Sequence, residues 1–177
     1  STINNAQTLT LTAGTAGGIT LSGITGGTTP LTTFTATGNT ISTTGVRTTG
    51  AQSYTGTTSS TFNDTYLSAG GVFGVTGAAL LGGATSIDTT NAGGTAAGAN
   101  ITFSSTINNG QTLSLTGGTA GAITLSGIVG GSSTLTSFTA NANTISTIGV
   151  NTNASQSYTG ATSTTFNGNY NVSTSSN

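Results

Sequence analysis

The sequence contains no cysteine and no histidine, and its 177 residues include only three charged side chains, Arg47, Asp64 and Asp88. Without thiolate or imidazole ligands the chain lacks the groups that hold zinc, haem or a reactive thiol. Calcium and magnesium need several carboxylates close together, and two are too few. We therefore expect no metal, no cofactor, no disulfide, no catalytic residues and no enzymatic activity.

Charge is as scarce as cysteine. Charged residues make up 2% of the chain, whereas a typical soluble domain carries roughly 25%. The net charge of −1 provides no basic surface for nucleic acid or for an anionic membrane. No stretch approaches the ~20 apolar residues that span a bilayer, so we expect no membrane insertion. The chain begins at Ser1 and shows no signal peptide, and we interpret it as a piece of a longer or processed protein.

The residues that are abundant favour order rather than disorder. Disordered segments usually combine high net charge with few β-branched residues, and this chain has one proline and many threonines. Threonine, valine and isoleucine suit a pleated, half-buried strand. The composition therefore predicts an ordered all-β protein.

A long internal repeat organises the chain. Residues 1–66 align with residues 105–170 at a shift of 104 positions without a gap, and 46 of the 66 pairs are identical. A fixed period without insertions is typical of repeat architectures, in which each unit packs on its neighbours. We assign residues 1–104 to a first solenoid repeat unit and residues 105–177 to a second, truncated unit of the same continuous solenoid.

Within each unit, short alternating stretches predict strands. Apolar and polar residues alternate over 7–12, 19–22 and 31–36, and the glycine-rich residues 13–18 predict a turn between the first two. Similar stretches recur about every ten residues, and none shows the 3.6-residue period of a helix.

Two all-β folds fit strands of this length. One is a parallel β-helix, or β-solenoid; the other is a series of β-sandwich repeats or a pilin-like sandwich completed by a donated strand. The solenoid is favoured because apolar residues occur singly or in pairs, too few for two facing sheets, and because Asn, Ser and Thr can stack in ladders. With coils of roughly 20–30 residues, one unit would hold four or five coils.

A single coil of this kind is not expected to fold alone. About five buried apolar side chains contribute ~1.5–3 kcal/mol each, and ordering some twenty residues costs ~1–2 kcal/mol each. Hydrogen bonds between neighbouring coils must supply the difference. Both ends of such a rod are adhesive unless they are capped. We therefore expect further coils on both sides, joined covalently or by end-to-end assembly.

The second unit carries a family resemblance. The segment 101–113 continues through Gly118 to 123–127, and with 156–160 and 165–168 it resembles the repeat region of giant bacterial β-strand-repeat surface proteins. These are similar to filamentous-haemagglutinin-type adhesins and secreted β-solenoid fibres. The resemblance covers essentially the whole chain. It implies a right-handed parallel β-helix, export to the cell surface or medium, and a role as stalk, adhesin or matrix fibre.

The charged residues have alternative interpretations. Asp64 and Asp88 are 24 positions apart, so they would stack in coils of matching length as an acid pair suited to general acid–base catalysis. The alternative is two solvated turn residues. Arg47 is a candidate for binding an acidic sugar, but the second unit has Asn151 there, which favours a plain surface role.

Tyrosines and threonines offer further candidates. Tyr54, Tyr66 and their counterparts Tyr158 and Tyr170 are either sugar-stacking platforms or core residues. The Thr-x-Thr runs in 8–12 and 33–37 are similar to those of ice-binding solenoids, which need threonines in register on every coil. Here the spacing of the runs along the sequence is uneven, which weakens that interpretation.

The sequence predicts a structural segment of an extracellular bacterial fibre or giant adhesin stalk, whose main partners are other copies of itself, end to end or side by side. Near-zero net charge removes the repulsion that would oppose such association. The alternatives are an adhesin module that binds glycans or a host surface, and an ice-binding solenoid.

Overall fold

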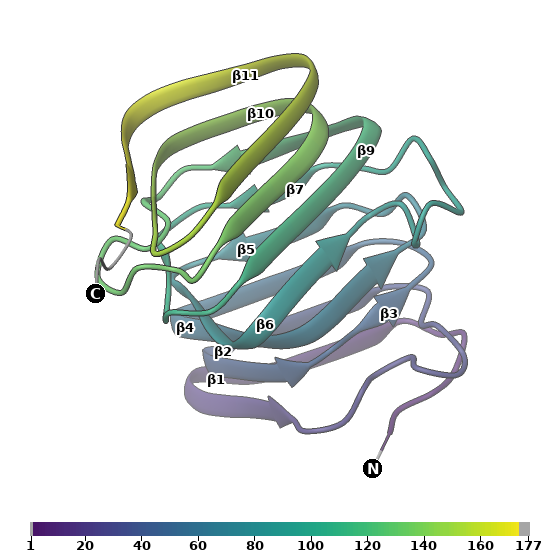
Figure 1. The fold of residues 1–177 in the computed structure, drawn as a ribbon. Coiled ribbons are helices and arrows are strands. Elements are labelled where there is room, and N and C mark those ends of the chain that lie inside the picture. Colours follow the sequence, from purple (N-terminus) through teal and green to yellow (C-terminus); the bar gives the residue numbers. More distant parts are fainter. Residues whose placement is uncertain (1, 174–177) are drawn as a thin grey trace.

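Strands account for nearly all regular structure in residues 2–173, which the computed structural model describes, and this region contains no helix (Figure 1). No segment in it forms a helix of the length and apolarity needed to cross a membrane. The strands are β1 (Leu9–Leu21), β2 (Phe34–Thr44), β3 (Arg47–Thr48), β4 (Gln52–Ser68), β5 (Phe73–Thr76), β6 (Ala79–Asp88), β7 (Ile101–Phe103), β8 (Ile107–Asn108), β9 (Leu113–Leu125), β10 (Phe138–Thr152) and β11 (Gln156–Val172).

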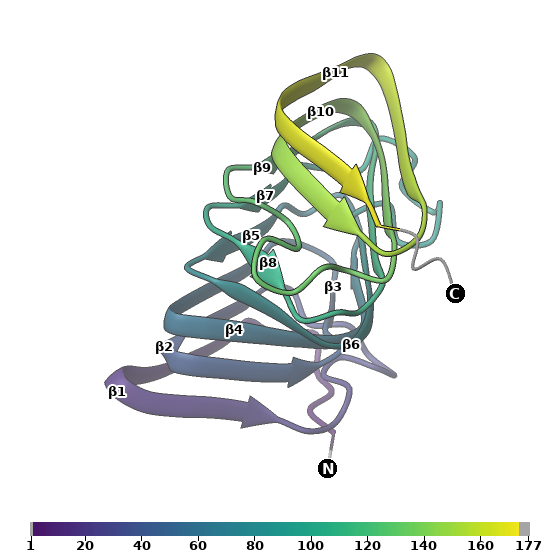
Figure 2. The same ribbon diagram turned by 60° about the vertical axis from the view of Figure 1, so that its left-hand side comes forward.

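The strands stack in parallel into a β-solenoid of about eight turns (Figures 1 and 2). One continuous path of hydrogen-bonded neighbours runs β1-β2-β4-β5-β7-β9-β10-β11. Every pairing between named strands is parallel, and the antiparallel contact is an isolated bridge between Ala69 and Thr90. The predicted solenoid is confirmed, and the sandwich and donor-strand alternatives, which need antiparallel sheets, are excluded.

The coils differ in length, and loops take up the difference. The stretch of chain that joins partners on successive coils is shorter from Phe34 to Gln52 than from Phe73 to Ile101. The longer coil contains the loop between β6 and β7, in which Asn91 and Ala92 have positive φ. Strand register therefore does not depend on a constant coil length.

The turn predicted at residues 13–18 is a corner inside β1 rather than a break between two strands. β1 continues from Leu9 to Leu21, and its pairing with β2 shifts register between Thr12 and Gly14 and again between Gly14 and Gly18. Gly14 has φ +70°, which only glycine adopts without strain. Strand pairing with β2 continues on both sides of the corner, so one strand serves two sides of the coil.

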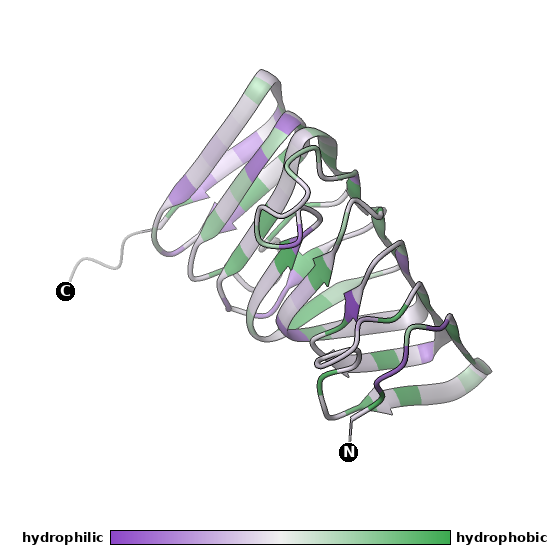
Figure 3. Ribbon diagram, turned by 90° about the vertical axis from the view of Figure 1, so that its right-hand side faces the viewer, coloured by the Kyte–Doolittle hydropathy of each residue, from purple (hydrophilic) through white to green (hydrophobic). Residues whose placement is uncertain are grey.

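The strand pairings define three sides on each coil, and stacking gives the rod three faces. Figure 3 shows the stacked coils from the side. The first face follows the inward column Leu9, Phe34, Gln52, Phe73, Ile101, Ile123, Ile145 and Thr164. The second face follows Ile19, Ile41, Ser60, Ala79, Ile107, Val129 and Val150. The third face follows Tyr66, Ile87, Leu115, Ala140 and Tyr158.

The second repeat is rotated about the rod axis relative to the first. Ile123 is the counterpart of Ile19, which lies on the second face, yet Ile123 stacks on Ile101 of the first face. Leu115 is the counterpart of Leu11, which lies on the first face, and it stacks on Ile87 of the third. The repeat period therefore spans four and two-thirds coils, and equivalent side chains lie on different faces in the two repeats.

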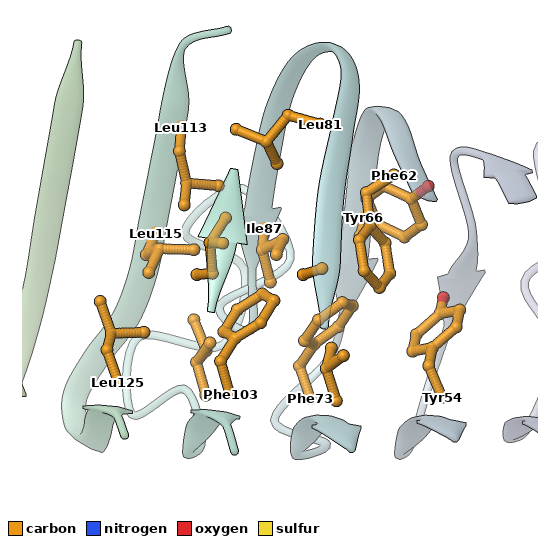
Figure 4. Packing of buried hydrophobic residues seen from close by; sticks show 14 of the residues in the cluster. Tyr54, Phe62, Tyr66, Phe73, Leu81, Ile87, Phe103, Leu113, Leu115 and Leu125 are labelled. Atoms are coloured by element: carbon orange, nitrogen blue, oxygen red, sulfur yellow. The ribbon is translucent and has the colours of Figure 1, made fainter. Parts of the chain in front are cut away.

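Aromatic rings fill the interior of the middle coils (Figure 4). The ring of Tyr54 lies 5.3 Å from Phe34 and 5.2 Å from Phe73, and Phe73 lies 6.0 Å from Phe103, centroid to centroid. All four are at most 2% exposed. Such contacts contribute ~0.5–1.5 kcal/mol each beyond area burial, so the column ties four successive coils together.

Candidate functional surfaces

The first coil leaves apolar side chains uncovered at the N-terminal end of the rod. Leu9, Leu11 and Leu21 are only partly buried, whereas their counterparts Leu113, Leu115 and Leu125 are at most 1% exposed. Beside Leu21, a hollow of about 250 Å³ is lined by Ile3, Thr20, Ser22, Gly23 and Thr25. The outer edge of β1 pairs with no other strand among residues 2–173. This end presents both apolar side chains and free backbone groups.

The last coil leaves aromatic rings uncovered at the C-terminal end. Phe166 on β11 is 52% exposed, whereas its counterpart Phe62 is fully buried. Its ring lies 4.9 Å from both Tyr158 and Tyr170, in the same edge-to-face arrangement that Phe62 makes with Tyr54 and Tyr66. In the first repeat this cluster is covered by Phe73; within the described residues no coil covers it in the second.

A polar network recurs in both aromatic clusters. The Gln52 amide donates to the carbonyls of Val46 (3.1 Å) and Leu67 (2.8 Å), and the Tyr54 hydroxyl donates to Gln52 Oε1 (2.9 Å). Gln156 and Tyr158 repeat the arrangement, again with 2.9 Å between the Tyr158 hydroxyl and Gln156 Oε1. Buried amides need such partners. The network is therefore built to lie inside the rod, and only the second copy lies at an end.

Burial in these clusters shifts tyrosine ionisation. Loss of hydration raises the pKa of Tyr54 well above 10, with a smaller contribution from the neighbouring Tyr66. Burial also raises the pKa of Tyr66 to about 12, opposed by its hydrogen bonds with Thr43 and with the backbone amide of Asn63. The pKa of Tyr158 is raised by loss of hydration, with Tyr170 nearby adding to the shift. These hydroxyls stay protonated, and act as hydrogen-bond donors, throughout the neutral range.

The two carboxylates do not form a pair. Asp64 is opposite Thr85, whereas Asp88 is opposite Leu67, so the register separates them by three positions along adjacent strands, about 10 Å. Asp88 instead caps a turn, because its carboxylate accepts hydrogen bonds from the amides of Thr90 (2.6 Å) and Ala92 (3.0 Å). The stacked acid pair is excluded, because the residue opposite Asp64 on the next coil is Thr85 and not Asp88. Asp88 lies three positions further along that strand.

Arg47 and the first-repeat tyrosines also have structural surroundings. Arg47 is half-buried and donates from Nη1 to the Gly27 carbonyl at 3.4 Å. Tyr54 and Tyr66 are at most 1% exposed, so they are core residues and cannot stack against a sugar. Among residues 2–173, no three acidic, histidine or cysteine side chains gather as metal ligands would.

The outer side of the first face carries two rows made mostly of hydroxyl side chains, with at least one hydroxyl on every coil and a pair on five of them. We call these rows the Thr face. One row contains Thr10, Thr35, Ser53, Gly74, Thr102, Thr124, Ser146 and Thr165. The other lies two positions further along each strand and contains Thr12, Thr37, Thr55, Thr76, Ser104, Ser126, Ile148 and Asn167. The side chain between each pair points inward.

The Thr face corrects one expectation from the sequence. Uneven spacing of the Thr-x-Thr runs predicts that their register is broken, but loops of different length absorb the unevenness and the strands pair in register. Thr12 is opposite Thr37, Thr37 opposite Thr55, and Thr55 opposite Thr76, although the stretches of chain between these partners differ in length. Sequence spacing alone could not show this, because the pairing partners are set by the strands and not by the loops.

The chain matches no family model, no curated protein and no solved structure. The resemblance to filamentous-haemagglutinin-type repeats therefore rests on the repeat and the composition of the chain itself.

Proposed function

We propose that this chain is a structural segment of an extracellular bacterial fibre or adhesin stalk, in which β-solenoid segments continue end to end. The observation that carries the proposal is the exposure of Phe166. It lies in a cluster whose internal duplicate, around Phe62, is completely covered by the following coil. The residues of the cluster are those of a buried core, and their exposure on the last coil supports an interface with a further coil.

The two ends are complementary in chemistry. The C-terminal coil presents the aromatic side chains of β11 and the N-terminal coil presents the leucines of β1. Because all coils wind in the same sense, the free edge of β1 from one copy meets the free edge of β11 from another in the parallel orientation used throughout the rod. Open edges of this kind are templates for pairing with another chain. Fully burying a side chain such as Phe166 contributes ~1.5–3 kcal/mol.

Composition supports a role outside the cell. The chain has no cysteine that oxidation would modify and almost no charge to drive copies apart. An exported fibre also needs a repeat that can be lengthened without redesign, and a solenoid with nearest-neighbour contacts meets that need. Protease treatment of intact producing cells tests the location: cleavage of the segment supports export, and full protection contradicts it.

Assembly is tested by comparing two substitutions on the same terminal strand. Phe166→Asp places a charge in the proposed interface, whereas Thr159→Asp places one on an exposed outward position of β11. We expect the parent protein and the Thr159 variant to form uniform rods with a ~4.8 Å axial repeat in electron micrographs and X-ray diffraction. The Phe166 variant should stay monomeric in sedimentation. Parent protein that remains monomeric at every concentration, or a Phe166 variant that assembles normally, would contradict the proposal.

A further inference from the structure

The Thr face differs from the other outward surfaces of the rod. All three charged residues of the chain lie off it: Arg47 and Asp88 are stacked on either side of Leu67 on the third face, and Asp64 lies opposite Thr85, between the second and third faces. On the second face, the outward row of hydroxyl side chains is interrupted by Leu80, which lies opposite Thr61 on the next coil. The third face has one outward hydroxyl row of its own, which contains Thr65, Ser86, Ser114, Thr139 and Ser157 and lies beside Asp88. The Thr face differs in that it carries at least one hydroxyl side chain on every coil from β1 to β11.

Among residues 2–173, the hydroxyls of the Thr face lack protein partners except that of Ser104, whose Oγ accepts a hydrogen bond from the Gly77 amide at 3.2 Å. Within residues 2–173, no hydrogen bond engages the hydroxyl groups of Thr10, Thr12, Thr35, Thr37, Thr55, Thr76, Thr102 or Thr124. Threonines elsewhere use theirs: Thr57 and Thr58 donate to Asn39 Oδ1, and Thr85 donates to the Phe62 carbonyl. Threonine at corners and in the core is structural, whereas on this face its hydroxyl is left to solvent.

The side chains of this face form a rigid two-dimensional array. Coils are about 4.8 Å apart, and residues two positions apart on a strand are about 6.7 Å apart. Threonine is restricted at χ1 by its branched Cβ, so few orientations of its methyl and hydroxyl groups are available on each coil. Eight coils extend the array over about 34 Å.

We propose that the Thr face binds the surface of ice. The surface lattice of hexagonal ice repeats at distances close to both spacings of the array, so methyl groups can order water between the rows while the hydroxyls anchor it by hydrogen bonds. The absence of charge on the face suits a neutral crystal of water. Its lack of exposed aromatic rings disfavours a polysaccharide, which stacks on such rings, and its lack of large apolar side chains other than Ile148 disfavours lateral packing of a second copy.

This surface and the ends of the rod are separate, so their tests are separate. Ice binding is measured with protein kept below the concentration at which it assembles, by inhibition of ice recrystallisation and by partition of labelled protein into a growing ice front. The matched variants are Thr124→Lys on the Thr face and Thr61→Lys on the second face, both half-exposed outward positions in middle coils. Circular dichroism and thermal melting check that each is folded.

We expect the parent and the Thr61 variant to inhibit recrystallisation, and the Thr124 variant to lose inhibition. If Thr124→Lys unfolds the chain, Thr102→Leu on the same face takes its place, with loss of inhibition again expected. Parent protein without activity, or equal activity in both lysine variants, overturns the proposal. Binding to crystalline cellulose, or dimerisation in sedimentation, that is abolished by Thr124→Lys while ice activity is absent also overturns it and assigns the face to that occupant.

Discussion

The two repeats have nearly the same sequence but different surroundings. Near the start of the repeat the first copy is the more exposed, and near its end the second copy is. Leu9 is partly exposed and its counterpart Leu113 is buried, whereas Phe62 is buried and its counterpart Phe166 is 52% exposed. The coils between residues 67 and 104 cover one side of each repeat and cause both differences. Burial in this protein is therefore decided by the neighbouring coil and not by the local sequence.

The polar networks show that local structure is nonetheless the same in both repeats. The Tyr54 and Tyr158 hydroxyls donate to their glutamines at the same 2.9 Å, although Tyr54 is fully buried and Tyr158 only half-buried. Each repeat folds its coils identically after a rotation of one face about the axis. Comparing equivalent residues of the two repeats therefore shows the effect of the neighbouring coil on a residue that itself stays the same.

The largest expected difference is between the two phenylalanines. Phe62→Ala removes a fully buried ring and should lower the free energy of unfolding by about 3–5 kcal/mol, whereas Phe166→Ala removes a half-exposed one and should cost less than about 1.5 kcal/mol in the monomer. Urea denaturation of both variants measures the two losses. Equal losses would show that the end coil is as tightly packed as the middle.

The second-largest difference is expected between Leu9 and Leu113, where the residue of the second repeat is the buried one. Leu113→Ala should destabilise the monomer by about 2–4 kcal/mol because the residue is fully buried between β6 and β10. Leu9→Ala should cost about 1 kcal/mol, because no coil covers its outer side among the described residues. The same denaturation experiment tests this pair, and a larger loss at Leu9 would contradict the account.

Tyrosine ionisation should limit stability at alkaline pH. Because folding raises the Tyr66 pKa from 10 to about 12, the neutral hydroxyl is favoured in the fold. Stability is then unchanged by this group below pH 10 and decreases between pH 10 and 12. Two pKa units correspond to about 2.7 kcal/mol. Thermal melting at pH 8, 10 and 12 measures the loss, and Tyr66→Phe, which removes the titrating group, should reduce the slope. If the dependence of melting temperature on pH is the same in the variant, a group other than Tyr66 causes the loss of stability.

Glycines at one corner should respond equally in the two repeats. Gly26 and Gly130 have φ of +73° and +72°, and in each a Cβ atom would lie 2.3 Å from a carbonyl oxygen of the next coil. Gly26→Ala and Gly130→Ala should each lower the free energy of unfolding by about 1–3 kcal/mol. Thermal melting checks both. A much smaller effect at one of them would show that the repeats differ in backbone as well as in surroundings.

Much of the fold could be predicted from the sequence, because it depends on local alternation. The alternating residues 7–12 and 19–22 correspond to the two sides of β1, and the scarcity of apolar residues correctly indicated stacked coils. The corner within β1 differs from the predicted break, because glycines at 13–18 indicate a turn whether or not strand pairing continues beyond it.

The candidate surfaces depend on quantities that no local pattern contains. The rotation of the second repeat follows from the sum of all coil lengths, and the alignment of the Thr face follows from the register of the stacked strands. Strand register also explains why Asp64 and Asp88 do not stack. Their stacking requires a coil length that matches their separation in the sequence, and the coil at this position is shorter. A signal was available for the Thr face: a hydroxyl residue, an inward residue and another hydroxyl residue recur at 10–12, 35–37, 53–55, 102–104 and 124–126.

Hydrogen exchange, measured on the monomer and on the assembled protein, tests the dependence of the end coils on a neighbour most directly. In the monomer, the backbone amides of β1 and β11 should exchange faster than those of β5, β7 and β9. On assembly, β1 and β11 should gain protection together while the middle strands change little. Assembly that leaves both end strands unprotected, or that protects a lateral face instead, would contradict the account.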